Sequence, residues 1–369
     1  MSEGIGTMGN DVWVLGATGR TGGAIAARLH AQGVPLTLVG RDRGRLEATA
    51  AGLDGAPGLV AGPLAGALAR LAGARPAVVV NTVGPFATTA AEVIPACPPG
   101  THYVDVSNEM AAAEYTLDRH AQAVAAGQTL VTGAGFGVLG TESVVLRLCQ
   151  DRPPAARVRA DAIASVASEP GFLGAALAAT IVEVLSYGGR EVRHGRLVRS
   201  PLGASPTRLT TPGGDTVSTG GGASGELLAA WRASGAADVL AASNAAPASA
   251  TLRLALPVLA TLLRVPAVGR FATRRIAAVR TRAQERPRAY SWAHARAEWA
   301  SGEVREGWLR AGDGMDFTAA VTAEVALRLA RGEGRPGAFT PGALFGPALA
   351  EAAGAEFLID DHHAPSTRG

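Results

Sequence analysis

Short apolar runs alternate with alanine-rich segments along the first 150 residues. The runs have the length of buried strands, and the segments between them have the length of helices. We expect strands near residues 12–15, 35–40, 58–62, 77–83, 101–107 and 129–135, and a long helix over Met110–Ala126. Strands that alternate with helices in this way indicate an α/β fold on a Rossmann-type, doubly wound parallel sheet.

The pattern changes beyond about Asp151. In Ala289–Trp299 large and polar residues alternate with alanine, which predicts a strand whose small-residue face packs closely against a helix. We expect Val304–Phe317 to pair with it, further strands at 157–166, 191–200 and 208–219, and a helix at 172–185. The sequence therefore predicts three parts: a cofactor domain over 1–150, an α+β domain with a largely antiparallel sheet over 151–320, and a C-terminal segment over 321–369 with a flexible tail.

Two stretches of the second part carry weaker signals. Pro201–Gly225 is rich in Gly, Ser, Thr and Pro, which favours a mobile loop or lid. Leu252–Val268 is the most hydrophobic stretch, but Pro257, Arg264 and Pro266 interrupt it, so it is too short to span a bilayer. We hypothesise that it forms an apolar wall or a contact for a lipid or carrier-bound substrate; an ordinary buried helix pair is the alternative.

The strand Val12–Leu15 runs directly into a glycine-rich turn that opens a helix. Gly16, Gly19 and Gly22 would let the backbone turn sharply and approach a pyrophosphate, which the amides at the helix N-terminus attract. The sequence therefore predicts a dinucleotide site here, with a plain strand-to-helix turn as the alternative.

The end of the second strand discriminates between the two nicotinamide dinucleotides. An acidic residue there would bind the ribose 2′-hydroxyl of NAD, but the chain has Gly40 followed by Arg41. A guanidinium pairs with a 2′-phosphate, so we predict NADP(H), with Arg43 or Arg45 as helpers. An inward-facing Asp42 would reverse this prediction, and solvated surface arginines are the alternative interpretation.

The segment that leaves the fourth strand is rich in small residues. Carboxyl ends of strands in open α/β sheets bind ligands, and the backbone here could run beside the nicotinamide ribose. The predicted contacts are Asn81, Thr82, Val83, Gly84 and Pro85, with Phe86 on the substrate side. An ordinary strand-to-helix turn remains open as an alternative.

Reduction of a polarised double bond needs a proton donor as well as a hydride. The candidates in the sequence are Tyr103, Asp105, Glu109, Tyr187, His194 and His294. We select Tyr103, Asp105 and Tyr187 as catalytic candidates, while water is a further source. All 34 basic residues are arginine, so the Tyr-x-x-x-Lys pair of short-chain dehydrogenases is excluded.

Charge and cysteine content limit the cellular compartments and the binding partners that fit this sequence. A formal charge of +3 with scattered arginines argues against nucleic acid. Cys97 and Cys149 have no metal-type spacing and fit a reducing cytoplasm, and the N-terminus lacks a signal-peptide pattern. His362 and His363 beside Asp360 and Asp361 are expected to be solvated tail residues, and no metal is predicted. The oligomeric state stays open, with a homodimer among the alternatives.

These motifs follow one another as they do in a known family. GATGRTGG, the Gly40-Arg41-Asp42 turn, NTVGPF, HYVDVSNE and TGAGFGV resemble the saccharopine dehydrogenase-like reductases, and within them the actinobacterial branch with the trans-acting enoyl reductases. WLRAGDGMDFTAA and FTPGALFGPALA are similar to the same branch, so the resemblance covers nearly the whole chain.

The resemblance implies a Rossmann domain that binds NADP, an inserted α/β domain, and a final segment that returns to the first domain. It assigns the pyrophosphate to Gly16, Thr18, Gly19, Arg20, Thr21 and Gly22, and the 2′-phosphate to Arg41. It places Asn81 to Pro85 beside the nicotinamide, and Gly135 and Phe136 in the active-site cleft.

The leading functional hypothesis is an NADPH-dependent reductase. It would transfer hydride to an activated C=C or C=N bond of a hydrophobic metabolite in a lipid or specialised biosynthetic pathway. A ketone reductase or dehydrogenase acting on C=O is the enzymatic alternative, and a non-catalytic NADP-binding sensor is the alternative from another class.

Overall fold

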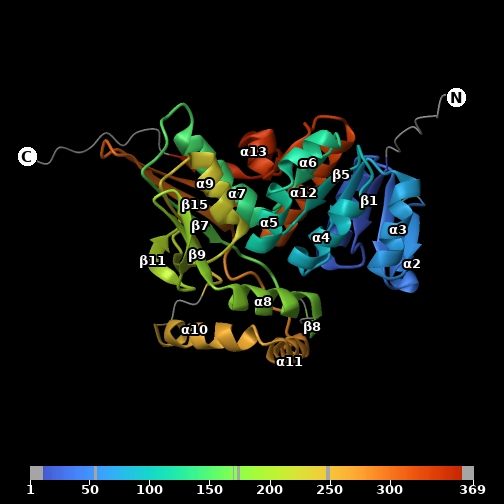
Figure 1. Ribbon diagram of the computed structural model, residues 1–369, viewed down its shortest axis with the longest axis horizontal. Helices are drawn as coiled ribbons and strands as arrows, with labels where there is room; N and C mark the ends of the chain where they lie inside the picture. Colours follow the sequence, from blue (N-terminus) through green and yellow to red (C-terminus); the bar gives the residue numbers. More distant parts are fainter. Residues whose placement is uncertain (1–10, 54–55, 169, 173–174, 247–249, 360–369) are drawn as a thin grey trace, which may run out of the picture.

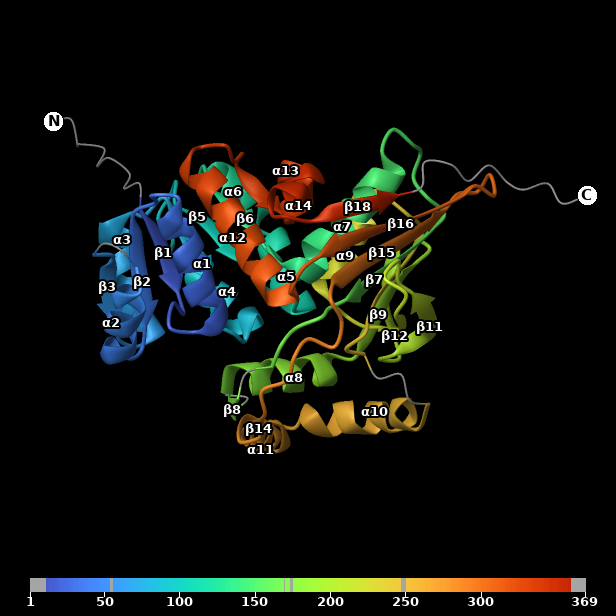
Figure 2. The same ribbon diagram turned by 180° about the vertical axis from the view of Figure 1, so that it is seen from behind.

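The computed structural model describes residues 11–359 except 54–55, 169, 173–174 and 247–249 (Figure 1). Two β-sheets lie side by side, each covered by helices, and a separate group of helices lies along one edge of both (Figures 1 and 2). The sequence predicts a solvated tail without a metal at Asp360, Asp361, His362 and His363. These four residues lie outside the described part of the chain.

The first sheet is entirely parallel, in the order β17-β6-β5-β4-β1-β2-β3. Its strands are β1 Val12–Leu15, β2 Leu36–Gly40, β3 Gly58–Ala61, β4 Val78–Asn81, β5 His102–Asp105, β6 Thr129–Val131 and β17 Gly337–Phe339. The central strands β1 and β4 are buried along their whole length, which explains their continuous apolar runs. The predicted Rossmann-type sheet is confirmed.

Helices pack on both faces of this sheet. They are α1 Arg20–Ala31, α2 Arg43–Ala51, α3 Leu64–Ala74, α4 Phe86–Ala96, α5 Met110–Leu117, α6 His120–Ala125 and, from the other end of the chain, α12 Gly314–Ala330. The single helix predicted over Met110–Ala126 is wrong, because the chain breaks it between α5 and α6. The Arg119 amide donates to the Thr116 carbonyl, three residues back, and the Arg119 guanidinium donates to the Tyr115 carbonyl at 2.7 Å. The Tyr115 carbonyl therefore does not accept the hydrogen bond that would continue the α-helix.

The second sheet is largely antiparallel, with one parallel pair, β13 and β7. Its strands are β7 Arg157–Ile163, β9 Gly189–Arg193, β10 Arg196–Ser200, β11 Ala204–Thr210, β12 Thr216–Gly221, β13 Asp238–Ser243, β15 Ser291–Glu298, β16 Val304–Ala311 and β18 Glu356–Ile359. Helices α7 Phe136–Cys149 and α9 Gly225–Ser234 pack on one face.

The alanine face of β15 packs against α7, as the alternation predicted. Ala293, Ala295 and Ala297 are buried, and a Cβ on Gly140 of α7 would lie 3.1 Å from the Ala293 Cβ. Small residues on both elements therefore let the helix approach the sheet closely.

Two predictions for the second part need correction. Pro201–Gly225, predicted as a mobile loop or lid, is mostly the hairpin of β11 and β12, which joins the sheet through β13. The strand expected over 191–200 is divided between β9 and β10, with a turn at His194 and Gly195, both at positive φ. Edge hairpins of this kind are rich in polar and turn-forming residues, so their composition resembles that of a loop.

The chain crosses between the sheets more than once. After β6 it passes to α7 on the second sheet, and it returns with α12 and β17 to the first. Two short helices, α13 Pro341–Phe345 and α14 Ala348–Ala352, then lead to β18 in the second sheet. The predicted return of the C-terminal segment is confirmed, whereas the boundaries at 150 and 320 stay predictions.

Helices α8 Ala175–Tyr187, α10 Ala250–Leu263 and α11 Pro266–Ala277 form the edge group, together with the short strands β8 Gly171–Phe172 and β14 Arg280–Thr281. Helix α8 contacts the first domain, because Thr180 donates a hydrogen bond to Glu109 at 2.7 Å and Tyr187 donates one to Glu114 at 3.0 Å. Helices α10 and α11 lie on the outer side of α8 (Figures 1 and 2). In the described part of the chain, no helix combines the length and apolar character needed to cross a membrane.

Candidate functional site

The glycine-rich turn between β1 and α1 forms a cradle made of backbone. Gly16 has φ +80°, and the Gly19 amide donates to the Gly16 carbonyl at 2.9 Å. A Cβ on Gly22 would lie 2.3 Å from the Gly16 carbonyl oxygen, so only glycine lets α1 begin this close to the turn. The N-terminus of α1, which carries no side-chain cap, faces the carboxyl edge of the sheet and fits a pyrophosphate.

Other residues of the turn hold it in place. The Thr18 carbonyl accepts a hydrogen bond from the Arg45 guanidinium at 3.0 Å. Arg20 donates to the Ala167 carbonyl at 2.8 Å, which links the turn to the segment after β7. Thr21 lies in the first turn of α1 and is partly exposed. Their predicted contacts with pyrophosphate stay predictions.

The carboxyl end of β2 carries an exposed arginine and a capping aspartate. Asp42 is the N-cap of α2, and its Oδ1 accepts from the Arg45 amide at 3.0 Å. Arg41 is exposed at the strand end, beside the turn that follows β1. An exposed guanidinium here is compatible with a phosphorylated ribose, and the contact of Arg41 with a 2′-phosphate stays a prediction.

The segment after β4 is shaped by Asn81 and Thr82. Asn81 is fully buried; its side-chain oxygen accepts from the Val83 amide at 3.0 Å, and its amide donates to Thr89 and Tyr103. Thr82 donates to the Leu15 carbonyl at 2.7 Å. These bonds hold the Val83-Gly84-Pro85 backbone at the edge of the sheet, where a nicotinamide ribose is predicted, and Gly84 lies against Thr180 of α8.

Tyr103 and Asp105, two of the three catalytic candidates, lie inside the sheet. Both are fully buried, and the Tyr103 hydroxyl donates to Asp105 at 3.0 Å. The other Asp105 oxygen accepts from the Ser107 and Gly133 amides and the Thr132 hydroxyl. Burial raises the pKa of Asp105, and these four donors oppose it. The network braces the ends of β5 and β6.

Tyr187, the third candidate, lies apart from the other two on α8. Burial and the contact with Glu114 raise the pKa of its hydroxyl, which is already engaged with that carboxylate. The structure therefore does not bring the three catalytic candidates together, and their predicted role stays untested.

A cavity of about 220 Å³ lies between the two sheets. Val106 and Ser107 come from the end of β5, which pairs with β4 in the register Asn81 to Asp105, so the cavity begins one strand away from the nicotinamide segment. The described residues that line it are Val106, Ser107, Asn108, Gly133, Gly135, Phe136, Gly137, Val138, Ala162, Ala164, Val166, Glu226, Ser243, Asn244, Ala245, Gly314, Met315 and Thr318. Gly135 and Phe136 line this cavity, whereas Phe86 is outside this set. The place of Gly135 and Phe136 in an active-site cleft stays a prediction.

Glu226 is the site residue that sequence reasoning missed. It lies in the first turn of α9, lines the cavity and is 3% exposed. Its Oε1 accepts from the Asn108 amide at 2.9 Å, whereas its buried Oε2 has no hydrogen-bond partner among the described residues. Burial raises the pKa of this carboxyl, opposed by contacts with Ser224 and Asn108. A buried acid with an unused oxygen is a candidate proton donor.

The electrostatics of the cavity combine this acid with three helix N-termini. Glu226 is the only ionisable side chain among the described lining residues, and arginine is absent from that set. The first residues of α7, α9 and α12 all approach the cavity. The N-termini of α7 and α9 have no side-chain cap of their own and carry a partial positive charge, whereas the Asp313 carboxylate caps α12 by accepting from the Met315 and Asp316 amides. This environment favours a neutral, largely apolar ligand on which negative charge develops.

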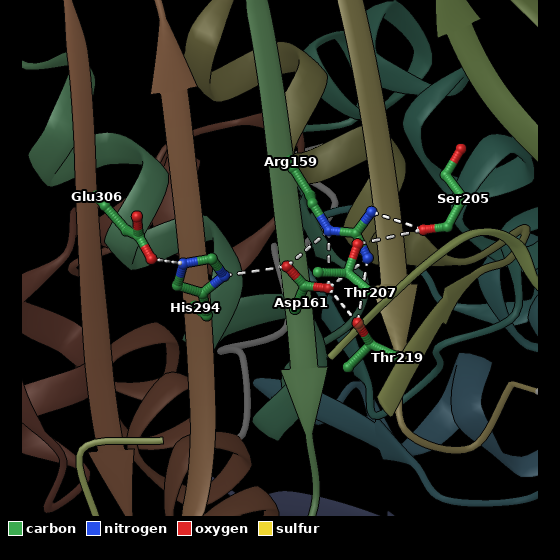
Figure 3. A network of polar contacts seen from close by, with 7 residues as sticks. All are labelled: Arg159, Asp161, Ser205, Thr207, Thr219, His294 and Glu306. Atoms are coloured by element: carbon green, nitrogen blue, oxygen red, sulfur yellow. Dashed lines mark hydrogen bonds and ion pairs between the residues drawn. The ribbon is translucent and has the colours of Figure 1, made fainter. Parts of the chain in front are cut away.

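A second polar cluster lies on the opposite face of the second sheet (Figure 3). His294 bonds to Asp161 at 3.0 Å and to Glu306 at 2.8 Å, and Asp161 also accepts from Arg159 and Thr219. Side chains alternate along β7, so Ala162 faces the cavity and Asp161 faces away from it.

The cluster is a closed ion-pair network. Burial disfavours a charged imidazole, but the bonds to Asp161 and Glu306 outweigh it and raise the pKa of His294. Burial likewise acts against ionisation of Asp161, but His294 and Arg159 hold its pKa below the usual value. His294, a proton-donor candidate from the sequence, is therefore engaged far from the cofactor edge. The described residues contain no group of His, Cys, Asp and Glu that could hold a metal ion.

Comparisons with known proteins bear on the first sheet most directly. Residues 12–131 match the family model of the saccharopine dehydrogenase NADP binding domain. A Mycobacterium tuberculosis protein with the provisional name trans-acting enoyl reductase, found in two strains, is 29% identical over 211 residues. That match covers 55% of this chain and 50% of the relative, so the chain spans about half the length of the curated relatives it matches.

The fold as a whole resembles a solved structure. The Saccharomyces cerevisiae saccharopine dehydrogenase that forms L-glutamate superposes with a TM-score of 0.59 at 13% identity, over 95% of this chain and all of that chain. This confirms the mixed α/β architecture of two sheets. The resemblance found in the sequence is confirmed over residues 12–131, which match the model of the saccharopine dehydrogenase NADP binding domain, and NADP(H) is the cofactor that this model describes.

Proposed function

We propose that this protein is an NADPH-dependent reductase that adds hydride to a C=C bond conjugated to a carbonyl group in a hydrophobic substrate. The observation that carries the proposal is the position of the apolar cavity, with a buried carboxyl, one strand away from the nicotinamide segment. The partial similarity to a protein named as an enoyl reductase supports the same bond type.

In this proposal the first sheet binds the cofactor. Gly16, Gly19 and Gly22 admit the pyrophosphate to the N-terminus of α1, and Arg41 pairs with the 2′-phosphate. The backbone from Asn81 to Pro85 lies beside the nicotinamide, which supplies a hydride when the reduced cofactor is bound.

Glu226 is the proposed proton source. Hydride adds to the β-carbon of the substrate and leaves a pair of electrons shared between the α-carbon and the carbonyl oxygen. Protonated Glu226 then gives its proton to the α-carbon, and water restores the acid. Burial keeps this carboxyl protonated at higher pH than an ordinary glutamic acid, as a general acid near neutral pH requires.

The charges around the cavity favour an enoyl substrate over an imine or an amino acid. Negative charge on the carbonyl oxygen would meet the N-termini of α7 and α9, which stabilise it. An iminium ion would instead carry positive charge toward the same helix ends. Amino-acid substrates need a cationic clamp for their carboxylates, and the described lining residues supply none.

The test follows oxidation of NADPH by the purified protein with three matched sets of acceptors: α,β-unsaturated thioesters and ketones, cyclic imines, and saturated ketones. We expect turnover with the unsaturated carbonyl compounds and a rate that falls as pH rises through the pKa of Glu226. Glu226→Gln should lower kcat by about 100-fold or more and remove this pH dependence, with NADPH affinity unchanged.

Glu142→Gln provides the matched control, because Glu142 is also buried but both of its oxygens accept hydrogen bonds away from the cavity, from Thr340, Gly342 and Ala343. Tight NADPH binding without turnover of any acceptor would reject the reductase and favour a cofactor sensor. Turnover of imines or ketones alone would reject the assigned bond type, and wild-type kcat in Glu226→Gln would reject Glu226 as the donor.

A further inference from the structure

Exposed apolar side chains are concentrated on the outermost helices. Seven of the nine large hydrophobic residues that the structure exposes lie between residues 258 and 279. They are Val258 at 64%, Leu259 at 39%, Leu262 at 50%, Val265 at 48%, Val268 at 37%, Phe271 at 63% and Val279 at 49% exposed. Soluble proteins rarely expose so many together without a binding role.

Helix geometry places these residues on an outer face. Val258 and Leu262 follow the i, i+4 spacing and lie on one side of the α10 end, and Val265 lies in the turn that leads into α11. Leu256 and Leu263, which are buried, lie on the other side, where α10 packs on α8. Helix α11 has no buried residue at all. Both helices form the outer layer of the molecule, beyond α8 (Figures 1 and 2).

The same stretch is strongly basic. Between residues 250 and 282 the sequence has seven arginines and no acidic residue, although the whole chain carries only +3, so the remainder has a net charge of −4. The arginines are Arg253, Arg264, Arg270, Arg274, Arg275, Arg280 and Arg282. Arg270, Arg274 and Arg275 are exposed on α11, and the Arg275 guanidinium lies 5.7 Å from the Phe271 ring centre.

We propose that α10 and α11 dock the protein on a lipid bilayer with anionic phosphate headgroups. The apolar side chains insert between the headgroups, and the arginines pair with the phosphates. A second copy of this chain fits less well, because a twofold contact would place the exposed arginines of α11, Arg270, Arg274 and Arg275, against the same basic helix of the other copy. The surface also differs from a protein interface. Its exposed apolar residues are mostly aliphatic, with one aromatic, and they spread along two helices, whereas protein interfaces have compact clusters of aromatic residues.

The docking surface adjoins the catalytic half of the molecule through α8. Thr180 of α8 bonds to Glu109 and lies against Gly84 of the nicotinamide segment. A protein bound through α10 and α11 therefore holds its cofactor edge one helix layer away from the lipid.

The experiment measures sedimentation of the full chain with vesicles of phosphatidylcholine alone and of phosphatidylcholine with one-third phosphatidylglycerol. We expect binding to the anionic vesicles that weakens in high salt, because the arginines are screened. Leu262→Asp and Phe271→Asp should each lower the partition coefficient at least tenfold, and Arg270→Gln and Arg274→Gln about fivefold each.

Two matched variants control for nonspecific effects. Val124→Asp alters a residue 49% exposed on α6, and Arg331→Gln alters an exposed arginine at the end of α12; both should bind vesicles as the wild type does. Circular dichroism and NADPH affinity verify that each variant is folded. Equal binding to both kinds of vesicle, no binding, or undiminished binding by Leu262→Asp and Phe271→Asp would overturn the proposal. Self-association or binding to an acidic carrier protein that these variants abolish, without vesicle binding, would assign the surface to that partner instead.

Discussion

The two walls of the cleft use different means to hold a ligand. The wall made by the first sheet consists of glycines, backbone amides and the closed network around Asp105, whose carboxylate has four donors. The wall made by the second domain is apolar apart from a few polar groups, and its buried carboxyl, Glu226, has one partner and one unused oxygen.

This contrast distinguishes a carboxylate that holds the fold in place, Asp105, from a carboxyl group that is free to act on a ligand, Glu226. A carboxylate whose hydrogen bonds are all made holds strand ends in place and has no capacity left for a ligand. A buried carboxyl with an unpartnered oxygen lowers the stability of the fold. Stability alone therefore does not explain why a glutamate occupies this position. Substitutions in the first sheet and in the second sheet should therefore differ in whether they lower stability, cofactor affinity or turnover.

Asp105→Ala should lower the free energy of unfolding by about 4 kcal/mol, because it leaves two amides and two hydroxyls unpaired inside the sheet. Glu226→Gln should change it by less than about 1 kcal/mol. Denaturant titrations of both variants measure the difference. Comparable losses in the two variants would remove the distinction between the walls.

Gly22→Ala should weaken NADPH binding about 100-fold, since its methyl group would lie 2.3 Å from the Gly16 carbonyl oxygen and push α1 off the turn. Gly73→Ala in α3 is the control, because a Cβ there has nothing within 4 Å. Fluorescence titration with NADPH measures both affinities. An unchanged affinity in Gly22→Ala would contradict the cradle.

Arg41→Ala should weaken NADPH binding by roughly 10- to 30-fold and leave NADH binding unchanged, because the guanidinium meets only the 2′-phosphate. Arg43→Ala, which removes a predicted helper that is already paired with Glu47 at 2.9 Å, should lower NADPH affinity less than Arg41→Ala does and leave NADH affinity unchanged. If Arg41→Ala retained the wild-type preference for NADPH, the 2′-phosphate would have to be bound elsewhere.

His294→Gln tests the closed network on the far face of the second sheet. The pKa of His294 is raised by folding, so its stabilising effect is complete below the unfolded value of 6.5 and is lost as pH rises through the folded value. The stability difference from wild type should therefore be about 1 kcal/mol larger at pH 6 than at pH 9. Because Asp161 has a lowered pKa, the difference should shrink again as pH falls below 3.8. Thermal unfolding at these pH values measures it, and a difference independent of pH would contradict the ion-pair assignment.

Features set by neighbouring residues were predictable from the sequence. The cradle of Gly16, Gly19 and Gly22, and the strand with its alanine face in Ala289–Trp299, each depend on spacing within one short segment. The orientation of Asp42 could not be predicted, since an aspartate before a helix either caps it or turns toward a ligand.

Features set by contacts between distant segments were not predictable. Glu226 is 118 residues from Asn108, its partner at the cavity, and nothing in the local sequence GELLAAW distinguishes it from a solvated helix residue. The burial of Tyr103 and Asp105 was not predictable either, because their strand β5 is enclosed by β4 and β6, which come from other parts of the sequence.

The path of the last 60 residues has a consequence for how the chain folds. Strand β17 completes the first sheet and β18 completes the second, and they lie at 337–339 and 356–359. Neither sheet can acquire its final strand before this short stretch of chain has been made. The same stretch therefore closes the edge of both sheets, and a truncation before residue 337 would leave β6 and β16 without an outer neighbour.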